Sequence, residues 1–220
     1  MNSIRKTQNS KLGVGVFGGT FDPIHYGHLR PAQEALEKLA LAEVRFIPAA
    51  QPPHRPPPVA SPEQRLAMVE LAIRGRPGFR VDDRELRRGG PSYTVLTLES
   101  LRTEQAASPL CLLIGMDQFL GFESWRRWQE IPELAHIVVL SRPGAAPGSL
   151  PAWARGRETE NIAELQQTAA GRLVFLAVSP QDMSATRIRA ALAQGDPVAG
   201  MLPEAVLEYI QVNHIYVRSR

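Results

Sequence analysis

The sequence predicts an α/β protein whose core is a doubly wound parallel sheet. Short apolar runs alternate along the chain with longer segments in which apolar residues recur every three or four positions, as in amphipathic helices. Residues 12–49 have the order strand, helix, strand, which is typical of a right-handed crossover between parallel strands. Residues 110–114 are all apolar, as expected of a strand that is covered on both faces. A ligand is therefore expected at the carboxyl ends of the strands, where the strand order reverses.

The first half of the chain contributes strands and helices in alternation. The strands are expected at residues 12–17, 43–49 and 79–81, and the helices at 29–41, 61–75 and 92–101. Ser61 and Pro62 mark the start of the second helix, because serine caps a helix and proline fits its first turn. The proline-rich residues 51–60 exclude helix and internal strand, and residues 82–91 are expected to form a loop or an edge hairpin.

The second half continues the alternation. Strands are expected at residues 110–114, 137–140 and 173–178, and helices at 184–193 and 203–210. Trp125 and Trp128 fall in a short helical stretch. Residues 142–170 are rich in Pro, Gly, Ala and charge, so we expect a flexible insertion there. Residues 1–11 are polar and are expected to be a flexible leader, which leaves 12–220 as a single domain.

Composition narrows the class of protein. The chain has 220 residues, 44% of them hydrophobic, which suffices for a sizeable core, and its net charge of +3 suits a protein that handles phosphates. The basic residues form no stripe or cluster, so a nucleic-acid partner is not expected. No apolar run is long enough to span a membrane and the N-terminus lacks a secretory signal, which predicts a cytoplasmic protein. The single cysteine, Cys111, is expected to be a buried thiol, and a homo-oligomer is compatible with the sequence.

The most informative stretch is the sequence GGTFDPIHYGH at residues 18–28, between the first strand and the first helix. A turn at this place presents backbone N–H groups and the positive end of a helix dipole to a phosphate. His25 and His28 are three residues apart, so both can point from one face of the first helical turn, and Gly27 lets a ligand approach the backbone. A purely structural turn and a metal site are the alternatives, although the chain has no Cys-x-x-Cys or His-Glu-x-x-His pattern to complete a zinc site.

A second anion-binding pattern is MSATRIR at residues 183–189, where a helix is expected to begin. Ser184 can cap that helix, Thr186 lies in its first turn, and Arg189 can reach the same anion. A plain capped helix with a surface arginine is the alternative. Two anion sites at two helix N-termini suit a nucleoside triphosphate that is held at both ends of its phosphate chain.

Both motifs resemble signatures of the nucleotidyltransferase superfamily, the first its His-x-Gly-His motif and the second its Ile-Ser-Ser-Thr-x-Ile-Arg motif. Residues 12–217 look most like bacterial nicotinate-mononucleotide adenylyltransferases, although Met183 and Ala185 depart from the second signature and Ala185 lacks its hydroxyl. The resemblance implies a Rossmann-like nucleotidyltransferase fold. It also implies adenylyl transfer from ATP to nicotinate mononucleotide, which gives deamido-NAD and pyrophosphate in NAD biosynthesis.

The resemblance further implies roles for individual residues. The expected catalytic residues are His25, His28 and Arg189. The residues expected to bind ATP are Gly18, Gly19, Thr20, Phe21, Gly27, Asp117, Ser184 and Thr186. Those expected near the nicotinate nucleotide are His54, Arg55, Ser92, Tyr93, Thr94 and Trp125. Mg²⁺ is expected on the triphosphate, mainly through water, with no protein metal ligand.

Some of these assignments have alternatives. Asp117 could equally cap a helix, Trp125 could belong to the core, and Arg55 stands where the family pattern has lysine. The whole chain could be a superfamily member that acts on phosphopantetheine or an alcohol phosphate, against which Thr94 and Trp125 argue. It could also be a non-catalytic nucleotide-binding regulator, although the histidine pair argues against this. An RNA-binding protein of aminoacyl-synthetase ancestry would need a basic patch that the sequence lacks.

Overall fold

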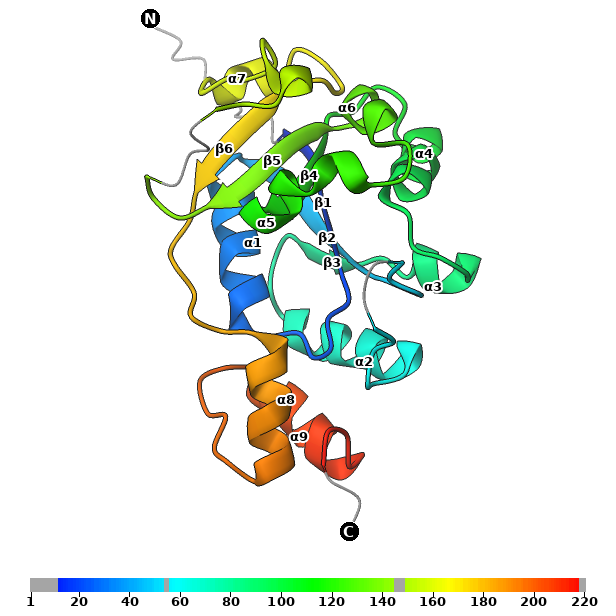
Figure 1. The fold of residues 1–220 in the computed structure, drawn as a ribbon, viewed down its shortest axis with the longest axis vertical. Helices are drawn as coiled ribbons and strands as arrows, with labels where there is room; N and C mark the ends of the chain where they lie inside the picture. The colour runs from blue at the N-terminus through cyan, green and yellow to red at the C-terminus, as the bar shows by residue number, and fades with distance from the viewer. Residues whose placement is uncertain (1–11, 54–55, 145–148, 218–220) are drawn as a thin grey trace, which may run out of the picture.

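In the computed structural model, which describes residues 12–53, 56–144 and 149–217, six strands form a single parallel sheet (Figure 1). The strands are β1 Leu12–Gly19, β2 Leu41–Pro48, β3 Phe79–Val81, β4 Leu110–Gly115, β5 His136–Ser141 and β6 Leu173–Ala177. Their order is β3-β2-β1-β4-β5-β6, and every neighbouring pair is parallel. The order reverses between β1 and β4, which confirms the doubly wound sheet and places the switch point at the end of β1.

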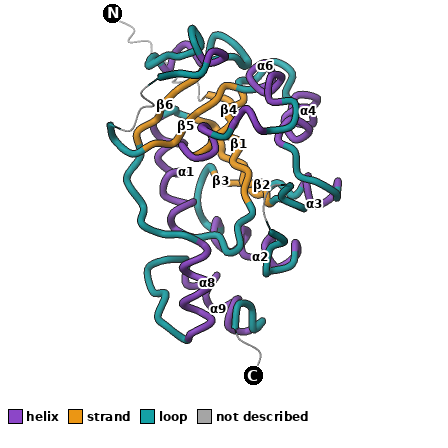
Figure 2. The backbone as a smooth tube through the Cα atoms, viewed as in Figure 1, coloured by secondary structure: helices purple, strands orange, loops and turns teal. Residues whose placement is uncertain are grey.

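Helices connect these strands (Figure 2). The α-helices are α1 Tyr26–Lys38, α2 Pro62–Ile73, α3 Arg84–Arg88, α4 Thr94–Glu104, α5 Met116–Leu120, α6 Ile131–Leu134, α7 Ile162–Leu165, α8 Ala185–Gln194 and α9 Glu204–Val212. Short 3₁₀ helices lie at η1 Phe122–Ser124, η2 Trp128–Glu130 and η3 Ala152–Ala154. The expected cap of α2 is confirmed, because the Ser61 hydroxyl accepts the backbone N–H of Gln64 at 3.2 Å.

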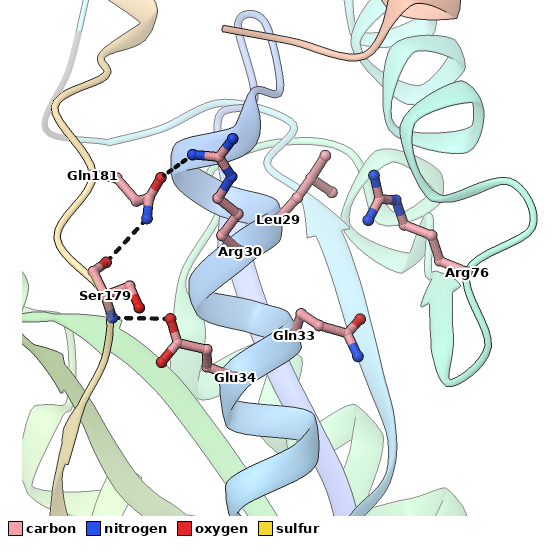
Figure 3. A pocket seen from close by; sticks show the side chains of 7 residues that line it. All are labelled: Leu29, Arg30, Gln33, Glu34, Arg76, Ser179 and Gln181. Carbon is pink, nitrogen blue, oxygen red and sulfur yellow. Dashed lines mark hydrogen bonds between the residues drawn. The ribbon is translucent and has the colours of Figure 1, made fainter. Parts of the chain in front are cut away.

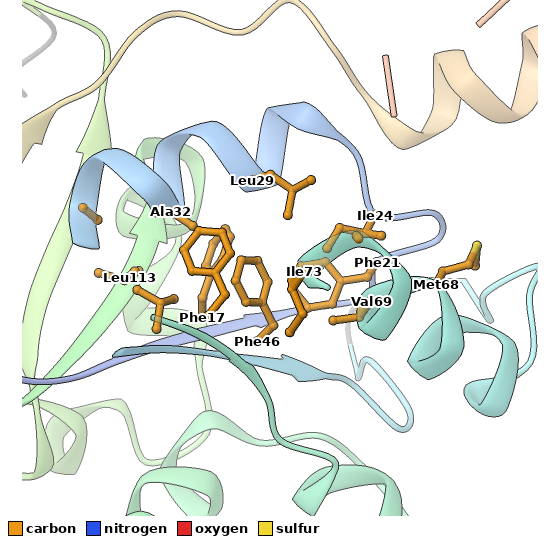
Figure 4. Packing of buried hydrophobic residues seen from close by; sticks show 14 of the residues in the cluster. Phe17, Phe21, Ile24, Leu29, Ala32, Phe46, Met68, Val69, Ile73 and Leu113 are labelled. Carbon is orange, nitrogen blue, oxygen red and sulfur yellow. The ribbon is translucent and has the colours of Figure 1, made fainter. Parts of the chain in front are cut away.

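Two hydrophobic clusters build the core. The larger cluster packs α1, α2 and α9 around four phenylalanines, Phe17, Phe21, Phe46 and Phe79. Figure 4 shows the first three of these rings together with Leu29 and Ala32 of α1 and with Met68 and Val69 of α2. The smaller cluster contains α4 and the residues around Phe122. Cys111 is fully buried in β4, which confirms the expected buried thiol, and burial raises its pKa to about 12.

The prediction of a loop or hairpin at residues 82–91 is wrong, because this segment contains α3. The helix is held by charge rather than by apolar periodicity. The guanidinium of Arg84 donates to Asp82 at 2.7 Å and to Glu104 at 3.1 Å, and the Arg84 side chain is only 8% exposed. Glu85 is also buried and accepts the hydroxyl hydrogen bond of Thr97. A charged, glycine-containing sequence therefore folds here into a packed turn of helix.

Near the first motif, two boundaries differ from the expectation. Gly18 and Gly19 belong to β1, so the turn begins only at Thr20, and α1 begins at Tyr26 rather than at residue 29. In the described part of the expected insertion, Ala154 and Leu165 are fully buried, and residues 152–154 and 162–165 are helical. The flexibility of that segment stays a prediction.

The C-terminal helices α8 and α9 lie at one end of the molecule, beside α2 (Figure 1). The backbone N–H of Tyr26, the first residue of α1, donates to the carbonyl of Met201 at 2.9 Å. This contact brings the last part of the described chain next to the turn between β1 and α1. Within the described residues, no helix has the length and apolar character needed to cross a membrane.

Candidate active site

The two histidines of the first motif lie together at the start of α1. His25 is the N-cap residue, and its Nδ1 accepts the backbone N–H of Gly27 at 3.1 Å. Nδ1 of His28 accepts the backbone N–H of His25 at 3.3 Å, so the two residues form a reciprocal capping box. The ring centroids are 3.9 Å apart. The sequence spacing therefore does place both imidazoles on one face of the first turn.

These hydrogen bonds define which nitrogen carries the proton in a neutral ring. Each Nδ1 accepts a backbone N–H, so a neutral imidazole carries its proton on Nε2. Burial lowers the pKa of His25 to about 4, which keeps that ring neutral at pH 7. His25 therefore presents a neutral N–H donor, which can hydrogen-bond a phosphate oxygen without carrying a full charge.

Aromatic residues of the core support the His28 ring. Phe21 meets it edge-on at a centroid distance of 5.2 Å, and Phe17 lies at 6.3 Å. Phe21 is only 2% exposed, so its side chain belongs to the core, and its expected role in binding ATP stays a prediction. Its backbone φ of +50° is uncommon for a bulky residue and bends the chain sharply after Thr20. The ring of Phe21 thus packs against one side of the His28 ring.

The glycines of the motif have different reasons for being glycine. A Cβ at Gly27 would lie 2.8 Å from the His25 ring and 3.4 Å from Cβ of Met183, so the space above the backbone is already used by the protein. A Cβ at Gly19 would lie 2.8 Å from the Phe21 ring. Gly18 has open space around it and is exposed, so it is the glycine at which a ligand could approach closely.

Arg189 of the second motif reaches the first motif. Its Nη1 donates to the backbone carbonyl of Asp22 at 2.7 Å and lies 3.7 Å from the Asp22 carboxylate. The Arg189 side chain keeps 28% of its surface exposed, so it can also meet a ligand. Ser184 caps α8 as expected, accepting the N–H of Arg187 at 3.2 Å, and Thr186 is exposed in the first turn. The two expected anion sites therefore lie on the same side of the molecule.

Asp22 is a buried site residue that the sequence analysis missed. Its carboxylate accepts the backbone N–H groups of Val59 at 2.9 Å and Ala60 at 3.0 Å and the hydroxyl of Tyr216 at 2.7 Å. Asp22 is 5% exposed, and the peptide bond from it to Pro23 is cis. The only available signal was its position three residues before His25.

Arg65 is a second missed residue. It is fully buried in α2, donates to the carbonyl of Thr20 at 2.8 Å and to that of Ala50 at 3.3 Å, and has no hydrogen-bond partner for Nε within the described residues. The guanidinium thus joins the chain segments that follow β1 and β2. A signal did exist, because Arg65 lies three and four positions before the buried Met68 and Val69, on the apolar stripe of the helix.

The residues expected near the nicotinate nucleotide lie on two neighbouring segments. The Ser92 hydroxyl accepts the N–H of Ala50 at 2.8 Å, which joins the start of α4 to the segment after β2. Thr94 is the first residue of α4, and the Tyr93 ring lies 4.7 Å below the guanidinium of Arg126. Trp125 is half-buried and packs on Phe122 at 5.4 Å. His54 and Arg55 lie outside the described residues.

Asp117 is exposed in the first turn of α5. The alternative that it caps this helix is wrong, because the N-cap residue is Gly115, whose N–H donates to Gln118 at 3.0 Å. A Cβ at Gly115 would lie 2.7 Å from the Asp117 carboxylate. In the part of the chain that the structure describes, no group of three His, Cys, Asp or Glu side chains could hold a metal ion.

A hollow of about 270 Å³ lies on the outer face of α1 (Figure 3). Arg30 donates to Gln181 at 2.9 Å across it, and the backbone N–H of Ser179 donates to Glu34 at 2.9 Å. The residues that line it are Leu29, Arg30, Gln33, Glu34, Arg76, Ser179 and Gln181. Neither His25 nor His28 lines this hollow, so it is distinct from the site built around the two motifs.

Comparisons with known proteins agree with the fold and identify relatives of this chain. The cytidylyltransferase-like family matches residues 16–191. A protein of Halorhodospira halophila named "Probable nicotinate-nucleotide adenylyltransferase" is 50% identical over 200 residues, which cover 90% of this chain and 92% of the relative. A protein of the same name from Aeromonas hydrophila is 48% identical over 209 residues, which cover 94% and 98%.

A solved structure shares the fold. It is the Plasmodium falciparum nicotinic acid mononucleotide adenylyltransferase complexed with NaAD, with a TM-score of 0.68 and a sequence identity of 13%. The match covers 93% of this chain and 97% of that one. At this identity the likeness concerns the fold alone.

Proposed function

This chain belongs to the cytidylyltransferase-like family, among the nicotinate-nucleotide adenylyltransferases, and on that premise we propose how its own residues perform the reaction. The enzyme transfers the adenylyl group of ATP to nicotinate mononucleotide in NAD biosynthesis. A phosphate oxygen of the mononucleotide bonds to the α-phosphorus, the bond from that phosphorus to the bridging oxygen breaks, and pyrophosphate leaves with the bonding electrons. Deamido-NAD is the other product.

The chemistry needs position and charge stabilisation more than proton transfer. The attacking phosphate is already ionised at pH 7, so no general base is required. In our proposal, His25 and His28 donate hydrogen bonds from Nε2 to the oxygens of the α-phosphate, where negative charge accumulates in the transition state. The 3.9 Å spacing of the rings and the neutral state of His25 support this role. Gly18, Gly19 and Thr20 are proposed to bind nearby phosphate oxygens.

Arg189 is proposed to hold the outgoing phosphates. Its guanidinium is partly exposed and is tied to the carbonyl of Asp22, three residues before His25. A forked cation at this position would bind the β- and γ-phosphates while the histidines bind the α-phosphate. Ser184 and Thr186 at the start of α8, and Asp117 at the start of α5, complete the proposed ATP site.

The acceptor nucleotide is proposed to bind between the start of α4 and Trp125. The first N–H groups of α4, near Tyr93 and Thr94, lack partners inside their own helix and can receive the carboxylate of the pyridine ring. The indole of Trp125 can stack on that ring. Ser92 supports this arrangement through its hydrogen bond to Ala50. Predicted contacts of His54 and Arg55 would come from the segment between β2 and α2.

Mg²⁺ is proposed to bind mainly through the triphosphate and water. The described residues offer no cluster of three acidic or imidazole ligands. Mg²⁺ commonly keeps several waters and binds few protein ligands, so phosphate oxygens and water would be its main ligands here. The ion would supply charge neutralisation on the phosphates. We further propose a cytoplasmic location.

The observation that carries the proposal is that Arg189 and the two histidines converge on the same turn, through Asp22. The test is pyrophosphate release with ATP and, separately, nicotinate mononucleotide, nicotinamide mononucleotide and phosphopantetheine. Fast release with the nicotinate compound is expected. Release only with phosphopantetheine would make the chain another member of the superfamily, and ATP binding without any release would make it a regulator.

A further inference from the structure

Asp22 joins four segments that are far apart in the sequence. It accepts the N–H groups of Val59 and Ala60 just before α2, and the hydroxyl of Tyr216 beyond α9. The backbone carbonyl of the same residue accepts a hydrogen bond from Arg189 on α8. Because Asp22 lies in the turn that leads to His25, its position links Arg189 to the histidine pair of the proposed triphosphate site.

Tyr216 is the member of this network that has no other evident task. It is 7% exposed and its hydroxyl lies 2.7 Å from Oδ1 of Asp22. Burial and the neighbouring Asp22 raise the pKa of Tyr216, so the hydroxyl stays protonated and donates. Its side chain touches the core and the carboxylate, not the exposed face on which a nucleotide would bind.

The backbone around Tyr216 is strained. Tyr216 has a φ of +64° and His214 a φ of +51°, values in the left-handed region that bulky side chains rarely adopt. Such conformations persist only where the surrounding contacts hold them, and they gather at functional sites. Between them Ile215 is buried, so the chain turns twice to put one side chain into the core and the next onto Asp22.

We propose that Tyr216 is a positioning residue, which fixes the distance between Arg189 and the histidine pair by holding the Asp22 carboxylate. It acts through Asp22 and touches no substrate. When the hydroxyl is removed, the turn at residues 20–25 gains freedom, and Arg189, which is bound to that turn, moves with it. The two ends of the triphosphate are then held at a changed separation. This inference rests on the proposed function.

The test uses the full chain and Tyr216→Phe, which keeps the packed ring and removes only the hydroxyl. The matched control is Tyr209→Phe on α9, because the Tyr209 hydroxyl makes no hydrogen bond within the described residues. We expect Tyr216→Phe to lower kcat/KM for ATP about tenfold, since small displacements of reacting groups are costly. The control should stay close to the unchanged protein, with both variants kept at a temperature at which circular dichroism shows them folded.

A double-mutant comparison separates positioning from general stability. If Tyr216 acts through Arg189, then Tyr216→Phe should lower kcat/KM for ATP by less than about twofold in an Arg189→Ala background, because coupled residues are not additive. An equal tenfold loss in both backgrounds would overturn the proposal, and so would an unchanged kcat/KM in the single variant.

Amide hydrogen exchange supplies a readout that does not depend on activity. Tyr216→Phe should speed exchange at residues 20–28, while Tyr209→Phe should not. Unchanged exchange at those amides would also overturn the proposal. If the unchanged protein makes no deamido-NAD from ATP and nicotinate mononucleotide, the proposed function fails first and this inference fails with it.

Discussion

The imidazole of His28 accepts the backbone N–H of His25, and the imidazole of His25 in turn accepts that of Gly27. The two rings that are proposed to bind the α-phosphate are therefore also the cap of α1. Their Nδ1 atoms accept hydrogen bonds within the fold, and Nε2 is the atom that is proposed to meet the phosphate. A substitution at either position must be designed so that the two tasks can be told apart.

His28→Ala and His28→Asn should separate them. Both remove the Nε2 donor, so both should lower kcat about a hundredfold or more, as expected for one preorganised donor to a developing charge. Alanine also removes the cap acceptor and should cost about 1 kcal/mol of stability, whereas the asparagine oxygen can replace it. Pyrophosphate release and urea unfolding measure the two effects. Near-normal turnover in His28→Asn would contradict the catalytic role.

His25 should make the protein less stable as the pH falls. Its folded-state pKa of about 4 lies below the ordinary value of 6.5, so between these values the unfolded chain binds more protons and acidification favours unfolding. From pH 7 to pH 5 this should cost roughly 1–2 kcal/mol of the free energy of unfolding. The measurement is urea unfolding at both pH values for the unchanged protein and for His25→Asn.

The difference in pH dependence of the free energy of unfolding between the unchanged protein and His25→Asn gives the contribution of His25 alone. Burial also lowers the pKa of His136, which adds a loss of the same sign, but this contribution is common to both proteins and cancels. Equal pH dependence of the two would show that His25 is not held neutral by burial.

Arg65→Met should destabilise the fold far more than Arg74→Met. The first change removes a buried cation and leaves the half-buried carbonyls of Thr20 and Ala50 without donors, and we expect a loss of about 2–4 kcal/mol in urea unfolding. Arg74 is exposed at the end of the same helix and serves as the control, with an expected change below about 0.5 kcal/mol. Similar losses in the two variants would mean that the buried guanidinium does not hold these segments.

Trp125→Ala and Trp128→Ala test the acceptor site. Both indoles pack near Phe122, at 5.4 Å and 6.3 Å, so their losses of packing are comparable. Only Trp125 is proposed to stack on the pyridine ring, so only its removal should raise KM for nicotinate mononucleotide, by about tenfold, with KM for ATP unchanged. A rise of the same size in Trp128→Ala would assign both residues to the core alone.

Periodicity and local motifs predict those parts of the structure that depend on residues close together in the sequence. The strands at residues 79–81 and 110–114 and the histidine pair follow from patterns within a few residues of one another. Helix α3 could not be predicted in this way, because its five residues show no apolar period. The ion pairs of Arg84 hold it in place instead. The room left by Gly27 was assigned to a ligand, whereas the His25 ring occupies it.

The buried polar contacts could not be predicted, because their partners are distant in the chain. The hydroxyl of Tyr216 binds Asp22, which is 194 positions away in the sequence, and no pattern near either residue predicts this contact. Arg65 differs, since a cation on an apolar helical stripe is visible in the sequence and indicates a buried partner.

Because Cys111 is fully buried in β4, its thiol can report when the sheet opens. The chain has one cysteine, and its thiol is shielded and protonated in the native state, so maleimides and disulfide reagents have nothing to attack until the strand separates from its neighbours. The rate at which these reagents label Cys111 would then report the fraction of molecules in which β4 has separated from its neighbours. This measurement needs no engineered tag and applies to each of the variants above.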